Sequence, residues 1–171
     1  EEHGAVTAAM AIASDELSFD AVLVRGIGGD PRRAGVEAAR SLRGTSPPAA
    51  LLCHWDPLTG VDVDALVAGL GESGAPTLVG GAAAQTWGPV VTTFQIDGTE
   101  VARDALVAVS VRGADVLVDT SHGAEPIGVG MRVTRAEGNA LFELDGRPAL
   151  DVWREMTGGD GTLRSEAVGA W

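Results

Sequence analysis

A polar run at residues 119–122, with the sequence Asp-Thr-Ser-His, holds the residue types of a hydrolase triad. A serine activated by a histidine base is a common nucleophile in acyl transfer. Ser121 and its neighbour cannot readily form that hydrogen bond, however, and the strained Gly-x-Ser-x-Gly turn of the α/β-hydrolases is missing. A donor-rich loop that ends at Pro126 is more typical of ligand contact or of a simple turn. A small hydrolase using Ser121 or His54 remains an alternative.

A glycine-rich turn at residues 26–30, Gly-Ile-Gly-Gly-Asp, follows an apolar run and opens a helical pattern. Backbone N–H groups at such a turn, aided by the helix dipole, can hold a phosphate. The third glycine of the dinucleotide fingerprint is missing, and Asp30 puts a negative charge where the phosphate would lie. These residues therefore predict a tight strand-to-helix turn in which Asp30 caps the helix.

Cys53 and His54 are adjacent in a predicted strand, so their side chains point to opposite faces and cannot act as a pair. Cys53 is expected to be a small buried hydrophobic residue. His54 ends the strand at the edge where ligands of open α/β sheets gather. The other histidines, His3 and His122, share no metal-ligand spacing with it, and no zinc site is expected.

The first half of the chain alternates between strand and helix patterns. Apolar runs predict strands near 21–25, 49–54 and 76–80, and apolar residues at helical spacing predict helices near 31–43 and 62–70. This order predicts three parallel strands joined by right-handed crossovers, with the helices covering a face of the sheet.

The second half of the chain predicts an antiparallel meander from about 89 to 144. Its strongest signal is the Asp-Gly pair at 97–98, which is typical of a tight hairpin turn. A helix at 148–156 follows and is expected to pack through Leu150 and Trp153. The predicted fold is therefore an α/β domain with a mixed sheet: a parallel βαβαβ half, an antiparallel meander and a C-terminal helix.

Composition excludes several classes of function. The chain has 171 residues, 24 acidic residues, 12 arginines and no lysine, and its net charge is −12. A nucleic-acid binder needs a basic face, and the same acidity disfavours an anionic membrane surface. The absence of lysine excludes a Walker A loop and a lysine Schiff base. A single cysteine, Cys53, excludes an internal disulfide and is typical of a reducing, cytoplasmic setting.

Three segments together carry a resemblance to a known family. They are the Gly80-Gly81 turn, the loop at 123–128 and the stretch from Val133 through Leu150. Their order resembles the N-terminal region of FIST (F-box and intracellular signal transduction) domains. The resemblance covers most of residues 21–156, which we take as the domain. Residues 1–20 are an N-terminal segment whose structure is left open, with residues 4–13 compatible with a strand or a weak helix, and residues 157–171 are a tail or the start of a following region.

The resemblance implies a cytoplasmic sensory module of a bacterial signalling protein, often joined to a histidine kinase or another output domain. Members are thought to bind small metabolites such as amino acids, and some bind haem and sense nitric oxide. The ligand-binding residues expected here are His54, Gly80, Gly81, Thr120, Ser121, His122, Gly123 and Glu125. No cofactor is predicted, but haem is an alternative, with His54 and His122 as axial candidates.

The chain departs from the family at the loop of residues 121–128. Members often have Ser-Gln-Gly-Cys-Arg-Pro-Ile-Gly, whereas this chain has Ser-His-Gly-Ala-Glu-Pro-Ile-Gly. Glu125 stands where the family has arginine, so a cationic or neutral ligand group is as well supported there as an anionic one. The sequence favours a non-catalytic module that binds a small ligand, with a haem-based nitric-oxide sensor and a hydrolase as the alternatives.

Overall fold

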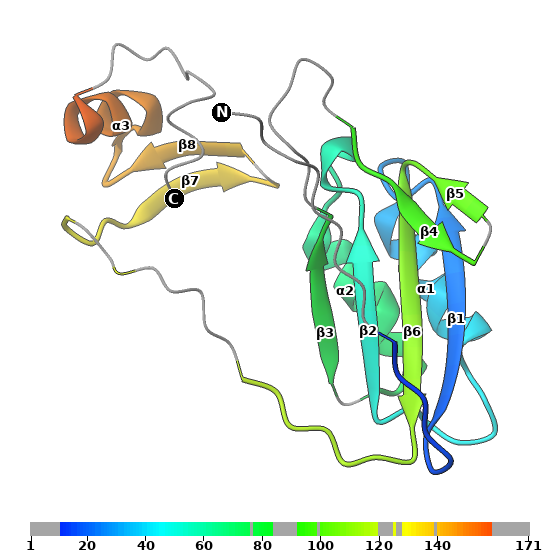
Figure 1. The fold of residues 1–171 in the computed structure, drawn as a ribbon. Coiled ribbons are helices and arrows are strands. Elements are labelled where there is room, and N and C mark those ends of the chain that lie inside the picture. The colour runs from blue at the N-terminus through cyan, green and yellow to red at the C-terminus, as the bar shows by residue number, and fades with distance from the viewer. Residues whose placement is uncertain are drawn as a thin grey trace, which may run out of the picture.

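A computed structural model describes residues 11–75, 77–83, 92–98, 100–119, 125, 128–138 and 140–158. Its main body is a four-stranded mixed sheet backed by two helices (Figure 1). The strands lie in the order β1 (Ser18–Arg25), β6 (Ala105–Arg112), β2 (Ala50–Trp55) and β3 (Leu78–Ala82). β2 and β3 are parallel, whereas β6 is antiparallel to both β1 and β2.

The predicted mixed-sheet α/β class is confirmed, and the strand order adds one feature. Strands β1, β2 and β3 run in one direction, as the βαβαβ pattern predicts, but β6 lies between β1 and β2. Its sequence, Ala-Leu-Val-Ala-Val-Ser-Val-Arg, is apolar on both faces, and its residues are buried or half-buried throughout. Such a strand is suited to the centre of a sheet, and it belongs there rather than to a separate meander.

Helices α1 (Pro31–Ser41) and α2 (Val63–Leu70) cover one face of this sheet. Asp30 caps α1 by accepting a hydrogen bond from Arg33 N at 2.9 Å, as the sequence predicts, and Asp62 caps α2 in the same way. The core between helices and sheet is closed by buried apolar side chains. These are Val24, Ile27, Ala34, Ala38, Leu42, Leu51, Cys53, Val61, Leu66, Leu70, Leu106 and Ala108.

The two helices touch through glycines. A Cβ atom placed on Gly35 of α1 would lie 2.4 Å from Leu66 O, and one placed on Gly69 of α2 would lie 2.3 Å from Arg32 O. Both distances are far below van der Waals contact, so the backbones approach as closely as they do only because neither position carries a side chain.

Arg112 at the end of β6 ties the sheet to the end of α1. Its guanidinium donates to the carbonyl oxygens of Leu42 and Ser46, to the Ser110 hydroxyl and to the Asp20 carboxylate. Arg112 is 9% exposed, so these hydrogen bonds satisfy a charge that burial would otherwise penalise.

The predicted meander forms three separate pieces instead of one sheet. The Asp-Gly hairpin is present as β4 (Gln95–Asp97) and β5 (Glu100–Ala102), β6 joins the main sheet, and a third sheet lies further along the chain. The third sheet contains β7 (Val133–Glu137), β8 (Ala140–Leu144) and β9 (Arg147–Pro148), all antiparallel.

Helix α3 (Ala149–Thr157) follows β9, close to the predicted 148–156. The expectation that it packs through Leu150 is wrong, because Leu150 is 52% exposed whereas Ala149 and Val152 are buried. Trp153 is half-buried. The three-residue spacing of Ala149 and Val152 puts them on one helix face, and Leu150 lies about 100° from Ala149 around the axis.

Within the described residues, no helix is long and apolar enough to cross a membrane.

Candidate functional site

A polar hollow of about 370 Å³ lies at the carboxyl end of β2, the edge at which open α/β sheets bind ligands. Its walls come from segments far apart in the sequence: the turn after β2, the segment before β4, and the β5–β6 turn. The lining residues are Asp56, Leu58, Thr59, Thr93, Arg103 and Asp104.

Asp56 is the structural centre of this hollow and is 4% exposed. Its Oδ1 accepts hydrogen bonds from Leu58 N at 2.9 Å and Thr93 Oγ1 at 2.6 Å, and its Oδ2 accepts from Asp104 N at 2.9 Å. Burial raises the pKa of Asp56, but these hydrogen bonds and the charge of Arg103 outweigh it, so the pKa lies below its ordinary value. Asp56 is therefore ionised and holds the three segments together.

Asp104 accepts hydrogen bonds from the glycine-rich turn at residues 26–30, the turn whose composition is similar to that of a phosphate loop. Gly26 N donates to its carbonyl oxygen at 2.7 Å, and Gly28 N donates to its Oδ1 at 2.8 Å. The carboxylate thus takes an N–H group that a phosphate would need at the start of α1, which supports the prediction of a structural turn. Asp104 has a φ of 49°, a left-handed conformation that turns the chain between β5 and β6.

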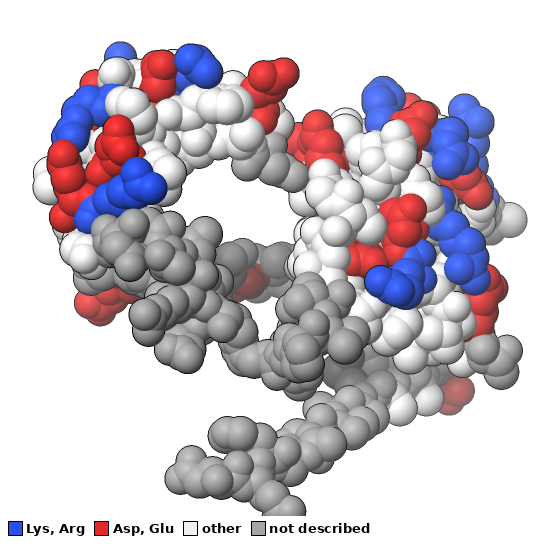
Figure 2. All heavy atoms as spheres, turned by 90° about the horizontal axis from the view of Figure 1, so that it is seen from above, with Lys and Arg blue, Asp and Glu red and all other residues white. Residues whose placement is uncertain are grey.

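Arg103 supplies the positive charge of the hollow. Its side chain is exposed, and none of the ion pairs among the described residues includes it. Figure 2 looks onto the carboxyl ends of β1, β2 and β3 and shows acidic and basic side chains intermixed over this part of the molecule. The hollow therefore offers one guanidinium for an anionic group beside two carboxylates.

Comparison with known proteins identifies the family. The family model described as the FIST N domain matches residues 2–147. The chain belongs to the FIST family. FIST domains are sensory, non-catalytic domains of signal transduction.

One similar protein is an uncharacterized protein of Methanocaldococcus jannaschii, 39% identical to this FIST domain over 89 residues. The aligned region is 51% of this chain and 17% of that protein, so the chain corresponds to a minor part of its relative's length. No solved structure gives a significant match. The relative is archaeal, and a bacterial source for the chain stays a prediction.

The structure places only some of the residues predicted to bind a ligand. His54 of β2 is exposed, and its register partner on β3 is Gly81, while Gly80 pairs with Cys53. Cys53 is buried against the helices, so His54 points to the opposite face, as predicted. Glu125 is exposed. The remaining residues, Thr120, Ser121, His122 and Gly123, lie outside the described part of the FIST domain.

None of these predicted residues lines the hollow. The hydrolase alternative, which uses Ser121 or His54, and the haem alternative, with His54 and His122 as axial candidates, both stay predictions. Among the described residues, no group of three or more His, Cys, Asp or Glu side chains could hold a metal ion.

Sequence reasoning missed Asp56, Thr93, Arg103 and Asp104. One signal was readable: Asp56 directly follows a predicted strand and precedes Pro57, a place where a carboxylate can cap the next turn and meet a ligand. Thr93 and Asp104 carried no such signal, because they reach Asp56 from 37 and 48 residues away.

Asp56→Asn should lower the free energy of unfolding by about 2 kcal/mol at neutral pH, because the amide puts an N–H group against one of three backbone or hydroxyl donors. The pKa of Asp56 is lower in the folded state, so its ionised form stabilises the fold above about pH 4, and this is lost as the pH falls through the folded pKa. Urea unfolding should therefore show a constant difference from pH 7 to 5 that shrinks below pH 4.

Asp64→Asn is the matched control for this titration. Asp64 is an exposed carboxylate in the first turn of α2, and its substitution should change stability by less than about 0.5 kcal/mol. A difference for Asp56→Asn that persists undiminished at pH 2 would contradict the role of its charge.

Proposed function

We propose that this FIST domain is a non-catalytic module that binds a small metabolite in the polar hollow and passes the binding event to a signalling output. The observation that supports this most directly is Arg103, a cation without an ion-pair partner among the described residues, beside the hydrogen-bonded Asp56 and Asp104. A guanidinium in this setting suits a carboxylate.

The chemistry of the walls favours a small zwitterion or organic acid. Asp104 uses Oδ1 to accept from Gly28 N, and its Oδ2 accepts no hydrogen bond from the described residues. That oxygen can accept from an ammonium group, so an amino acid would place its carboxylate on Arg103 and its ammonium on Asp104. At about 370 Å³ the hollow lies within the size range of small-molecule sites.

The arrangement also provides a route for signalling. Asp56, Asp104 and Gly28 connect the β2–α2 turn, the β5–β6 turn and the start of α1. A ligand that binds one arrangement of these three turns better than another would shift the population of the domain toward it. The output domain and a cytoplasmic location belong to this proposal.

Thermal unfolding with a panel of amino acids, organic acids and haemin tests the proposal. A ligand that binds only the folded state adds about 2.7 kcal/mol at 100 times its Kd. We expect an amino acid or organic acid to stabilise the domain, and Arg103→Ala to weaken that ligand about tenfold or more, the loss of one charged hydrogen-bonding group.

Arg40→Ala is the charge-matched control, since Arg40 is an exposed arginine in the last turn of α1, away from the hollow. If Arg40→Ala lowered the affinity for the ligand as much as Arg103→Ala, the loss would be a general effect of charge, and the proposed site would be refuted. Stabilisation by haemin alone would favour the haem-based alternative.

A further inference from the structure

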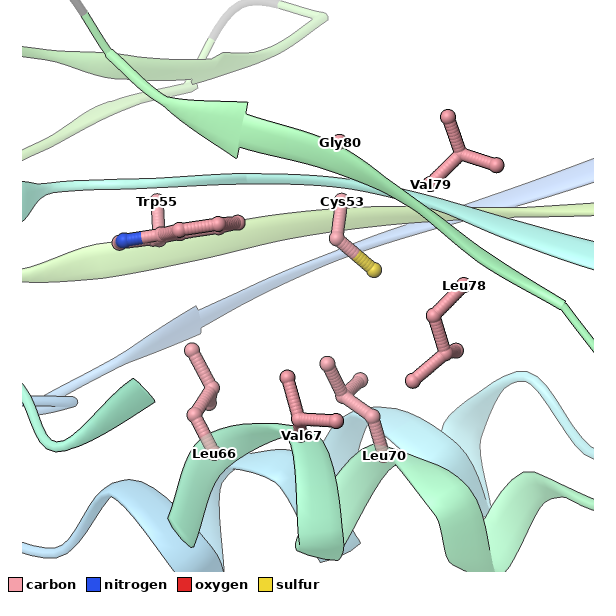
Figure 3. Close-up of a pocket in the computed structure, with 8 residues that line it drawn as sticks. All are labelled: Cys53, Trp55, Leu66, Val67, Leu70, Leu78, Val79 and Gly80. Atoms are coloured by element: carbon pink, nitrogen blue, oxygen red, sulfur yellow. The ribbon is translucent and has the colours of Figure 1, made fainter. Parts of the chain in front are cut away.

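A second cavity, of about 150 Å³, lies between α2 and the β2–β3 side of the sheet and shares no lining residue with the polar hollow. Figure 3 shows Leu66, Val67 and Leu70 projecting from α2 toward the sheet, where Cys53, Trp55 and Leu78 point back at them. The cavity is thus lined by a helix on one side and by two parallel strands on the other.

Gly80 adds no side chain to the wall of this space. Along β3, Leu78 faces the helix and Val79 faces away, so position 80 faces the helix again. A Cβ on Gly80 would lie 1.8 Å from Cys53 O, and its φ is 157°. The close approach of β3 to β2 therefore excludes a side chain at position 80, which lines the cavity with backbone alone.

The walls carry no charged side chain. Burial raises the pKa of the Cys53 thiol to about 11, so the thiol is neutral at physiological pH. Val67 lines the cavity and is still 42% exposed, which places it at an open mouth. An ionic ligand would lose its hydration here without gaining a partner.

We propose that this cavity is a binding site for a small, uncharged apolar compound, such as an aromatic ring or a branched alkyl group of about six to nine non-hydrogen atoms. A closed apolar cavity of about 150 Å³ can hold benzene, and this cavity has a similar volume and an apolar lining but opens to solvent at Val67. The flat indole of Trp55 forms one wall and suits stacking or edge contact with a ring. The site is separate from the polar hollow and does not depend on the function proposed for it.

Benzene and indole are the probes. NMR titration should show saturable shifts of the methyl groups of Leu66, Leu70 and Leu78, with a Kd of about 1 mM or lower for so few atoms. The chain has one cysteine, so labelling with a thiol reagent reports Cys53 alone. Benzene at ten times its Kd should slow that labelling about tenfold, because the occupied state is protected.

Val67→Phe should fill the mouth and abolish the methyl shifts, while Ala68→Phe adds the same ring at an exposed neighbouring position outside the cavity and should leave binding unchanged. Val67→Met is a second filling variant if the phenylalanine disturbs folding. Arg103→Ala should bind benzene as the wild type does.

Absence of saturable shifts in the wild type would overturn the proposal, as would undiminished binding by both filling variants. A concentration-dependent dimer that benzene dissociates would also overturn it, because the cavity would then hold a side chain of a second copy.

Discussion

Gly69→Ala is expected to lower the free energy of unfolding by about 2 to 3 kcal/mol, even though alanine is the better helix former by about 1 kcal/mol. The added Cβ would lie 2.3 Å from Arg32 O and 2.9 Å from Val36 N, both backbone atoms of α1. A flexible side chain could turn aside, but a helix backbone cannot, so the two helices must separate. Separation would open the core beneath them at Leu66 and Leu70.

Ala68→Gly is the opposite substitution at the neighbouring position of the same helix. Ala68 is exposed, so this change should cost only the helix propensity of about 1 kcal/mol. Urea unfolding of both variants separates the effect of helix propensity on stability from the effect of the contact between the two helices. If the Gly69→Ala variant were more stable than the wild type, α1 and α2 would have to be farther apart at Gly69 than the 2.3 Å Cβ distance implies.

Gly35 gives an independent test of the same contact. Gly35→Ala would place its Cβ 2.4 Å from Leu66 O and 2.8 Å from Leu70 N. Because both substitutions relieve their clash by the same helix separation, the double variant should lose less stability than the two single losses added together.

Local signals predicted the first half of the fold well. Asp30 followed by Pro31 marks the start of α1, and apolar residues at helical spacing mark α2. These features act over three or four residues, so the sequence contains all the information needed. The Asp-Gly pair at 97–98 belongs to the same class, and the hairpin is present.

The two neighbours of β6 in the sheet, β1 and β2, could not be predicted in this way. Its pairing with β1 joins residues about 90 apart, as Asp20 with Ser110 shows, and nothing local fixes which strand lies next to which. The apolar character of both faces did indicate a central strand. The prediction of one continuous meander missed this because it followed the order of the chain rather than the two-sided burial of the strand.

The polar hollow could not be predicted from local sequence either, because long-range strand pairing brings its residues together. Asp56, Thr93 and Asp104 meet only because β6 returns the chain beside β2. The left-handed backbone of Asp104 has no glycine to mark it. By contrast, the opposite directions of Cys53 and His54 follow from strand alternation alone, and the structure confirms them.

Arg112→Met is expected to cost about 2 to 3 kcal/mol, because it removes charged hydrogen bonds to two buried acceptors, the Ser110 hydroxyl and Leu42 O, of which only Leu42 O keeps another donor, Gly44 N. The guanidinium bonds Leu42 O at the end of α1, Ser46 O in the following loop at 3.1 Å, and the Ser110 hydroxyl at 2.7 Å. Methionine fills a similar volume, so the loss would come from the missing hydrogen bonds rather than from a cavity.

The Asp20 ion pair contributes little to this expected loss. The carboxylate side chain is 64% exposed, and water replaces the contact when the arginine is removed. Asp20→Asn should therefore cost less than about 1 kcal/mol.

Arg112→Lys separates charge from geometry at the same site. Lysine keeps the positive charge but lacks the planar fork that reaches α1, the loop and the sheet together, so its stability should fall between those of the wild type and Arg112→Met. Thermal and urea unfolding of the three variants provide the measurement. If Arg112→Lys matched the wild type while Asp20→Asn cost as much as Arg112→Met, the ion pair would be the main contact, and the hydrogen bonds to the end of α1 would be secondary.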